Sequence, residues 1–200
     1  MRMLLTSNGI ANAAIEEALV DLLGKPIAEA RVVVVLDAIL GFPGDSAKLV
    51  EHLEGLRALG WAELDVASLF AGPAELVASR LRGADVVLGY GGSNLWAAHA
   101  WTATGLAPVL AEVLEQQVYV GWSAGSMIFA RDLARWPDAF DDGDELTMFG
   151  LAEAAPAAPL FDWFFAGHLG ANWMPPTAEA WASRGAARTG REVWFVDDDT

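Results

Sequence analysis

The sequence predicts a doubly wound α/β fold, in which helices cover both faces of a mostly parallel sheet. Short apolar runs alternate along the chain with segments of helical periodicity. Several of these runs, notably Val32-Val33-Val34-Val35 and Val86-Val87-Leu88, are apolar at every position rather than at every second one. Strands of this kind are typical of parallel sheets that are buried on both sides.

The expected elements follow one another in a regular βα order. The expected strands cover residues 3–6, 31–36, 62–66, 85–88 and 118–121, with further strand-like runs at 160–165 and 192–196. Helical periodicity covers residues 11–23, 46–59, 73–82, 95–102 and 107–116. In such folds ligands bind beyond the carboxyl ends of the strands, so the loops that follow the strands are the places to search for a site.

Composition predicts one α/β domain over residues 1–200, because 54% hydrophobic residues in 200 are enough for one large core. The net charge of −15 and the 12 Lys and Arg argue against nucleic acid and anionic membranes as partners. No apolar stretch approaches the roughly 20 residues of a membrane helix, and the apolar N-terminal run is too short for a signal peptide. A cytoplasmic location is therefore expected.

The sequence contains no cysteine, which removes disulfides, thiol nucleophiles and cysteine-based metal sites. Any covalent catalysis must therefore use an oxygen nucleophile.

The most informative motif is Gly121-Trp122-Ser123-Ala124-Gly125, which follows an apolar strand-like run and precedes a helix-compatible one. It matches the G-x-S-x-G nucleophile elbow, in which a strained strand-to-helix turn exposes the serine. Ser123 is the candidate nucleophile, and the N–H of Ala124 is a candidate oxyanion donor. A tight turn whose serine only caps the helix is the structural alternative.

A second glycine-rich loop, Gly89-Tyr90-Gly91-Gly92, follows the strand at 85–88. An oxyanion hole needs a second N–H, and glycine lets the backbone approach a substrate closely, so we assign Gly92 as that donor. A simple tight turn or a phosphate-cradling loop is equally compatible with these residues, although the lysine of a phosphate-binding P-loop is missing.

An activated serine needs a base, and the chain offers His52, His99 and His168. His52 lies on a polar helix face and His99 lies within a tryptophan-rich helix, so both are expected to be surface or packing residues. His168 follows the strand-like run at 160–165 and precedes a glycine-bearing loop, which makes it the candidate base. Among the acids between residues 138 and 145, Asp138 follows Trp136-Pro137 and is the candidate that orients the imidazole.

With these motifs the chain resembles peptidase E, the aspartyl dipeptidases, which are related to cyanophycinases and have a class I glutamine amidotransferase-like fold. The opening residues 3–8, the loop Gly91-Gly92-Ser93-Asn94 and the motif at residues 121–125 carry the resemblance, which covers most of the chain. The family's catalytic order of serine, aspartate and histidine would carry over onto Ser123, Asp138 and His168.

The resemblance implies a serine peptidase that cleaves short peptides after an N-terminal aspartate through an acyl-enzyme. It implies no metal and no organic cofactor. An acidic substrate side chain requires a cation in the pocket, for which Arg131 and Arg135, just after the elbow, are the candidates, with surface solvation as the alternative role. Arg135 and Asn94 are the residues we assign to substrate binding. Because family members continue beyond the strand at 192–196, this chain is expected to lack their C-terminal segment.

Two other functions stay open. A general serine esterase would share the elbow, but the sequence has no HGGG-type oxyanion loop. A non-catalytic relative that binds a ligand or a partner would explain the nine tryptophans, since aromatic residues anchor interfaces, and a homodimer is an open assembly state. The tryptophans that suggest it are Trp96, Trp101, Trp163, Trp173 and Trp181.

Overall fold

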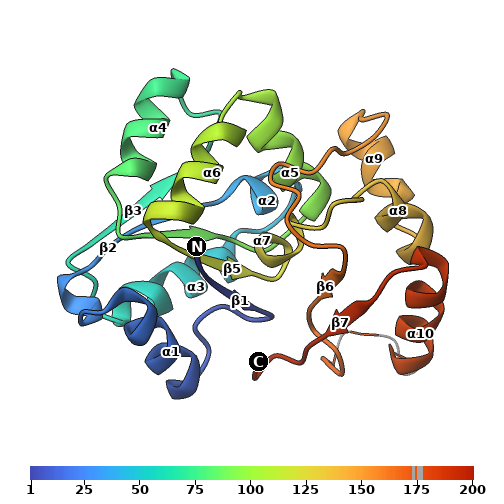
Figure 1. The fold of residues 1–200 in the computed structure, drawn as a ribbon, viewed down its shortest axis with the longest axis horizontal. Coiled ribbons are helices and arrows are strands. Elements are labelled where there is room, and N and C mark those ends of the chain that lie inside the picture. The colour runs from blue at the N-terminus through green and yellow to red at the C-terminus, as the bar shows by residue number, and fades with distance from the viewer. Residues whose placement is uncertain (173, 175–177) are drawn as a thin grey trace.

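A computed structural model of the chain describes residues 1–172, 174 and 178–200. Its centre is a parallel five-stranded sheet in the order β1-β5-β4-β2-β3 (Figure 1). The strands are β1 (Arg2–Thr6), β2 (Arg31–Val35), β3 (Glu63–Ala67), β4 (Val86–Gly89) and β5 (Val118–Trp122). The predicted doubly wound α/β fold is confirmed, and all five strands start and end within two residues of their expected bounds.

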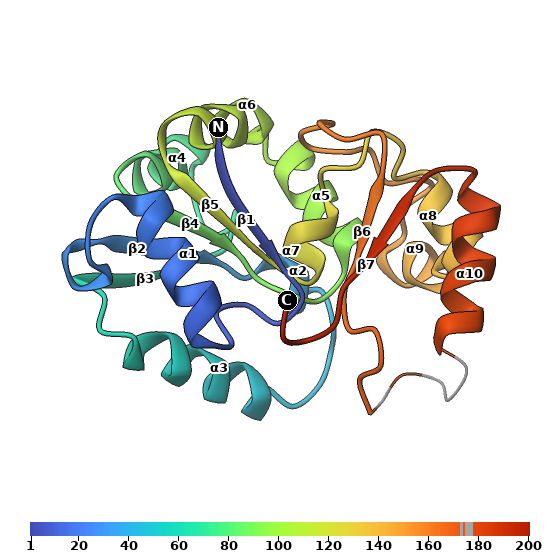
Figure 2. The ribbon, with the colours of Figure 1, turned by 60° about the horizontal axis from the view of Figure 1, so that its bottom comes forward.

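Helices lie on both faces of this sheet, as Figures 1 and 2 show. The elements of this part are α1 (Ala13–Leu23), η1 (Ile27–Glu29), α2 (Asp37–Leu40), α3 (Ala47–Ala58), α4 (Ala74–Arg82), α5 (Asn94–Ala103), α6 (Ala107–Gln116) and α7 (Ala124–Met127). Helices α1 and α3 cover one face, whereas α4, α5 and α6 cover the other.

The continuous apolar strands explain these two layers. In β2, Val32 and Val34 pack in the core beneath α1 and α3, whereas Val33 and Val35 pack in the core on the opposite face. All four valines are less than 5% exposed. Because successive side chains of a strand point to opposite faces, a strand with a helix layer on each side must be apolar at every position.

The C-terminal part of the chain adds a small parallel pair of strands and three helices (Figure 2). These elements are α8 (Arg135–Phe140), α9 (Gly143–Phe149), β6 (Phe164–Ala166), α10 (Ala178–Thr189) and β7 (Val193–Phe195). The strand expected at 160–165 begins later, because residues 160 and 161 instead donate hydrogen bonds to the Phe129 carbonyl, and Ala130 bridges to Phe161.

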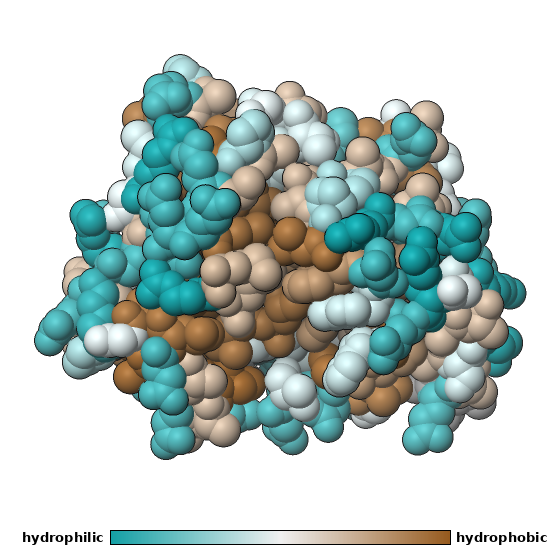
Figure 3. All heavy atoms as spheres, viewed as in Figure 1, coloured by the Kyte–Doolittle hydropathy of each residue, from teal (hydrophilic) through white to brown (hydrophobic). Residues whose placement is uncertain are grey.

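Of the tryptophans that suggested a binding surface, Trp96, Trp163 and Trp181 contact other rings of the same chain. Trp101 is 2% exposed, Trp96 stacks on Phe149, Trp163 stacks on Phe161, Trp181 packs against Phe140, and Trp173 lies outside the described residues. Figure 3 shows hydrophilic residues along the outer helices of one face and hydrophobic residues near its middle. Within the part of the chain that the structure describes, no helix is both long and apolar enough to span a membrane.

The carboxyl of Asp142, which precedes α9, is partly buried, and this burial disfavours its charged form. Burial raises the pKa of its carboxyl from 3.8 to about 7, with a further contribution from the nearby Glu145 and Asp141 charges, against a hydrogen bond from Trp136. A carboxyl whose pKa is raised by folding favours the folded state in its protonated form. Its contribution to stability is therefore complete below the pKa of the unfolded state. That contribution is lost as the pH rises through the folded-state pKa.

Asp142→Asn should therefore raise the melting temperature relative to wild type by an amount that grows from about pH 4 to pH 7 and then levels off. The amide keeps an oxygen that accepts from Trp136. Thermal unfolding across this pH range measures the effect, and Asp144→Asn, an exposed acid on α9, controls for the loss of one negative charge. A difference between Asp142→Asn and wild type that stays constant with pH would contradict the prediction.

Candidate active site

Ser123 lies at the point where β5 ends and α7 begins, with φ 51° and ψ −113°. A backbone with positive φ is strained for a residue with a side chain. Close packing of the surrounding residues must therefore hold Ser123 in this conformation. Gly121 and Gly125 allow this packing, because a Cβ at Gly121 would overlap Ser126 and a Cβ at Gly125 would overlap the backbone of Gly89. The turn has the strand–serine–helix geometry that the motif predicts.

Hydrogen bonds to β1 fix this turn in the sheet. The backbone N–H of Ser123 donates to the Thr6 carbonyl at 3.0 Å. The buried Ser126 hydroxyl also donates to that carbonyl, at 2.9 Å, and accepts from the Thr6 N–H at 3.1 Å. The first strand of the chain therefore positions the serine that follows the fifth.

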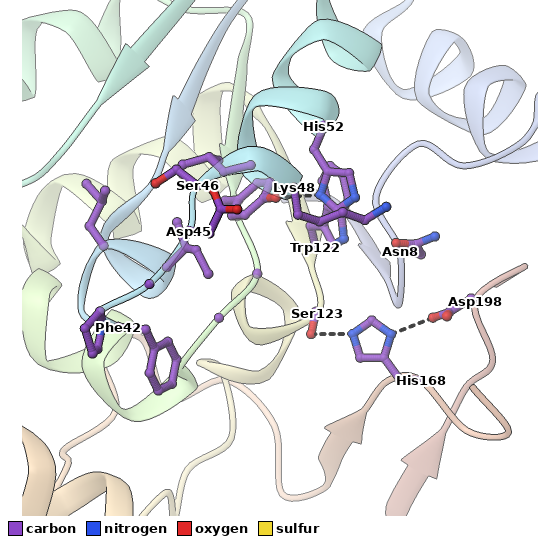
Figure 4. Close-up of a pocket in the computed structure, with 18 of the residues that line it drawn as sticks. Asn8, Phe42, Asp45, Ser46, Lys48, His52, Trp122, Ser123, His168 and Asp198 are labelled. Atoms are coloured by element: carbon purple, nitrogen blue, oxygen red, sulfur yellow. Dashed lines mark hydrogen bonds and ion pairs between the residues drawn. The ribbon is translucent and has the colours of Figure 1, made fainter. Parts of the chain in front are cut away.

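His168 follows β6 and brings its imidazole to Ser123 (Figure 4). Its Nε2 lies 2.8 Å from Ser123 Oγ, and its Nδ1 lies 2.6 Å from Asp198 Oδ1. Because a carboxylate only accepts hydrogen bonds, the proton of a neutral imidazole belongs on Nδ1, which leaves Nε2 free to accept from the serine hydroxyl. The three side chains thus have the arrangement of a relay for nucleophilic catalysis.

Ser7, directly after β1, joins the histidine to the acid. Its hydroxyl accepts a hydrogen bond from the backbone N–H of His168 at 2.7 Å and donates one to Asp198 Oδ1 at 2.8 Å. Ser7 is fully buried, whereas the side chains of His168 and Asp198 are 19% and 38% exposed. The β1–α1 loop therefore holds two members of the relay.

The structure brings together Ser123 and His168 as expected, but it does not bring Asp138 to the histidine. Asp138 is exposed on α8, because the residues around it, Trp136, Pro137 and Phe140, turn the apolar side of that helix into the core. Asp198, beyond the last strand, takes the position expected for Asp138. This corrects the expected chain order to serine, histidine, aspartate.

The glycine-rich loop lies beside the serine, as expected. A Cβ at Gly91 would lie 3.3 Å from Ser123 Cβ, so this loop and the serine are in direct contact. Gly92 has φ +133° and lies against the backbone of Ala38, where no side chain fits. Both glycines line the cavity in front of Ser123, and Ala124 begins α7 directly after the serine.

The cavity at Ser123 has a volume of about 600 Å³ and contains the whole relay. Neither predicted substrate-binding side chain lines it. Arg135 is exposed on α8, where it pairs with Asp132 at 2.6 Å and donates to the Thr189 carbonyl. Asn94 is 4% exposed in the first turn of α5, so it faces the packed layer rather than the cavity.

Helix α3 supplies side chains to the cavity that the sequence did not mark as functional. Lys48 and His52 both line it, on the side where Figure 4 also shows Trp122. His52 Nδ1 lies 2.5 Å from the Tyr90 hydroxyl, and its ring packs on Trp122 at 4.7 Å. Burial and the nearby Lys48 charge lower the pKa of His52, so it is neutral at pH 7.

A parallel sheet with a serine, a histidine and an aspartate hydrogen-bonded in series beyond its strands defines an α/β protein with a hydrolase-type site. The profile of Peptidase family S51 matches residues 3–200, and the chain belongs to this family of peptidases. This agrees with the resemblance to peptidase E. No protein in the curated collection matches the sequence.

Two solved structures are similar in fold. A protein assigned as a peptidase E from Listeria monocytogenes EGD-e has a TM-score of 0.75 at 15% identity, over 98% of this chain and 90% of its own. A peptidase from an acI-B1 actinobacterium has a TM-score of 0.59 at 16% identity, over 90% of this chain and 74% of its own. Both likenesses support the α/β fold.

The contacts of His168 predict that Asp198, not Asp138, controls the reactivity of Ser123. Asp198→Asn should slow covalent labelling of Ser123 by a fluorophosphonate on the order of a thousandfold, because an amide can hold the imidazole in the wrong tautomer. Asp138→Asn should leave the labelling rate within about twofold of wild type, because surface substitutions rarely matter. Labelling followed by mass spectrometry measures both rates, and a large effect of Asp138→Asn alone would contradict this assignment.

Proposed function

We propose that the protein is a serine peptidase that hydrolyses short peptides, dipeptides with an N-terminal aspartate above all, through an acyl-enzyme on Ser123. The observation that carries the proposal is the series of hydrogen bonds from Ser123 through His168 to Asp198 inside a cavity of about 600 Å³. Membership of Peptidase family S51 supports the same reaction.

In the acylation step, Ser123 Oγ attacks the carbonyl carbon of the scissile bond while His168 Nε2 takes the hydroxyl proton. Asp198 stabilises the imidazolium that forms. The negative charge on the substrate oxygen is met by backbone N–H groups of the Gly91–Gly92 loop and of Ala124. When the C–N bond breaks, His168 gives its proton to the leaving amine.

The deacylation step repeats this chemistry with water. His168 Nε2 takes a proton from the water that attacks the acyl carbon, and then returns one to Ser123 Oγ as the ester bond breaks. The products are the free N-terminal amino acid and the remaining peptide. Every proton transfer in the two steps uses His168, and one water is consumed.

Lys48 is the residue that we assign to the acidic side chain of the substrate. It is the one Lys or Arg among the described residues that line the cavity. Its ammonium group pairs with Glu51 at 3.0 Å and is largely exposed, so it can exchange that partner for a substrate carboxylate. Lys48 therefore replaces Arg135 in this role.

The nucleophile and the specificity are tested together with Asp-Ala, Ala-Ala and a simple ester as substrates. We expect wild type to cleave Asp-Ala selectively and Ser123→Ala, which keeps the fold, to lose turnover by a factor of roughly 10³ or more. Cleavage of the ester alone would indicate a general esterase. A folded protein that is inactive on all three would favour a binding relative.

The role of Lys48 is tested by removing and then restoring its charge. Lys48→Gln should lower kcat/KM for Asp-Ala about tenfold, since a charge-assisted hydrogen bond is lost, and Lys48→Arg should recover most of it. The neutral analogue Asn-Ala is the matched substrate control, because its rate does not depend on a cation. Equal losses on Asp-Ala and Asn-Ala would mean that Lys48 shapes the cavity without recognising charge.

A further inference from the structure

A second cavity of about 400 Å³ adjoins the one at Ser123. Its walls combine apolar and polar side chains: Ile10 and Ala11 come from the loop after β1 and Leu56 and Leu59 from α3 and its end, whereas Asn8, Glu51 and His52 add polar groups. Gly55 of α3 adds a stretch of wall without a side chain. No step of the proposed dipeptide reaction uses this cavity.

The two cavities meet at three shared side chains. Asn8, His52 and Trp122 line both of them. Figure 4 shows these three together on one side of Ser123, with the His52 ring packed on Trp122. The two cavities are therefore neighbours, and a peptide that extends from the first cavity past Asn8 would reach the second.

The position of His168 indicates which end of a bound peptide would lie toward the second cavity. His168 donates its backbone N–H to Ser7, the neighbour of Asn8, so the histidine and Asn8 flank the same side of the serine. In serine catalysis the histidine protonates the leaving amine, so the leaving group lies on the histidine's side. The second cavity thus extends the leaving-group side of the site.

We propose that the second cavity binds an apolar side chain of the third residue of a peptide, so that the enzyme accepts substrates extended beyond the dipeptide. This inference rests on the proposed function and extends it. The apolar part of the wall, formed by Ile10, Leu56 and Leu59, favours an apolar side chain, because its transfer from water is favourable. Glu51 at the same wall disfavours an acidic side chain at this position.

Gly55 allows the cavity to be filled without disturbing its surroundings. A Cβ at this position would have no atom within 4 Å, so a larger side chain has room. Gly55→Leu occupies the space, whereas Gly55→Ala shares its effect on the helix but leaves most of the volume empty. Ala11→Leu fills the cavity from the opposite wall, where Ala11 is exposed.

The experiment measures kcat/KM of wild type and of the three variants on Asp-Ala, Asp-Ala-Leu and Asp-Ala-Glu. Wild type should prefer Asp-Ala-Leu to Asp-Ala-Glu by about tenfold or more, as burial of a leucine side chain predicts. Gly55→Leu and Ala11→Leu should reduce that preference to about twofold, mainly through KM. Cleavage of Asp-Ala should change less than about threefold in every variant, and Gly55→Ala should behave as wild type.

Three results would overturn the inference. One is that wild type cleaves Asp-Ala but neither tripeptide. Another is that it cleaves both tripeptides equally well. The third is that the filled variants, with melting temperatures equal to that of wild type, keep the leucine preference. A folded wild type that is inactive on all three peptides would instead defeat the proposed function, and this inference with it.

Discussion

The hydroxyl of Ser7 holds the candidate site together. It accepts from the backbone of His168 and donates to Asp198, so one buried oxygen connects the first strand, the loop after β6 and the segment after β7. A buried hydroxyl with both a donor and an acceptor satisfied fixes the geometry of its partners far better than exposed side chains could. Without it, the His168 backbone N–H and the Asp198 carboxylate would each lose a hydrogen bond.

Two of the three non-glycine residues with positive φ in the described part of the chain lie in the candidate site, and the third is Asp141. Ser123 and His168 both have positive φ although neither is glycine, a conformation that costs on the order of 1–3 kcal/mol each. Ser123 is held by the hydrogen bonds to Thr6 and by packing around Gly121 and Gly125. His168 is held through Ser7. The rest of the sheet, with its fully buried strands, supplies the stability against which this strain is maintained.

Most of the fold could be predicted from the sequence because the strands are short, apolar and separated by clear helical segments. Ser123 and His168 were also predictable, since each follows a strand and belongs to a residue type with specific chemistry. Asp198 was not, because three adjacent acids at the chain end resemble a solvated tail. Its function depends on the β6–β7 pairing, which is a long-range contact.

The cavity-lining residues of helix α3 could not be recognised from the sequence, for a different reason. His52, Lys48 and Glu51 form a polar pattern that is typical of a solvent-exposed helix face, and the charge pattern is indeed largely exposed. What the sequence could not reveal is that this face borders the space in front of Ser123. The position of a helix relative to a neighbouring loop follows from tertiary packing, on which local periodicity carries no information. The misplacement of Asn94 and Arg135 has the same origin.

The separation of Ser7 and Asp198 in the sequence has a consequence for biosynthesis. These two residues are 191 positions apart, so their hydrogen bond closes nearly the whole chain into one loop. Contacts of such long range form late, because the entropy of loop closure must be overcome before they contribute stability. During translation the nascent chain can fold much of its sheet while the relay is still missing its acid. The hydrogen bonds among Ser7, His168 and Asp198 can therefore form only after residue 198 has left the ribosome.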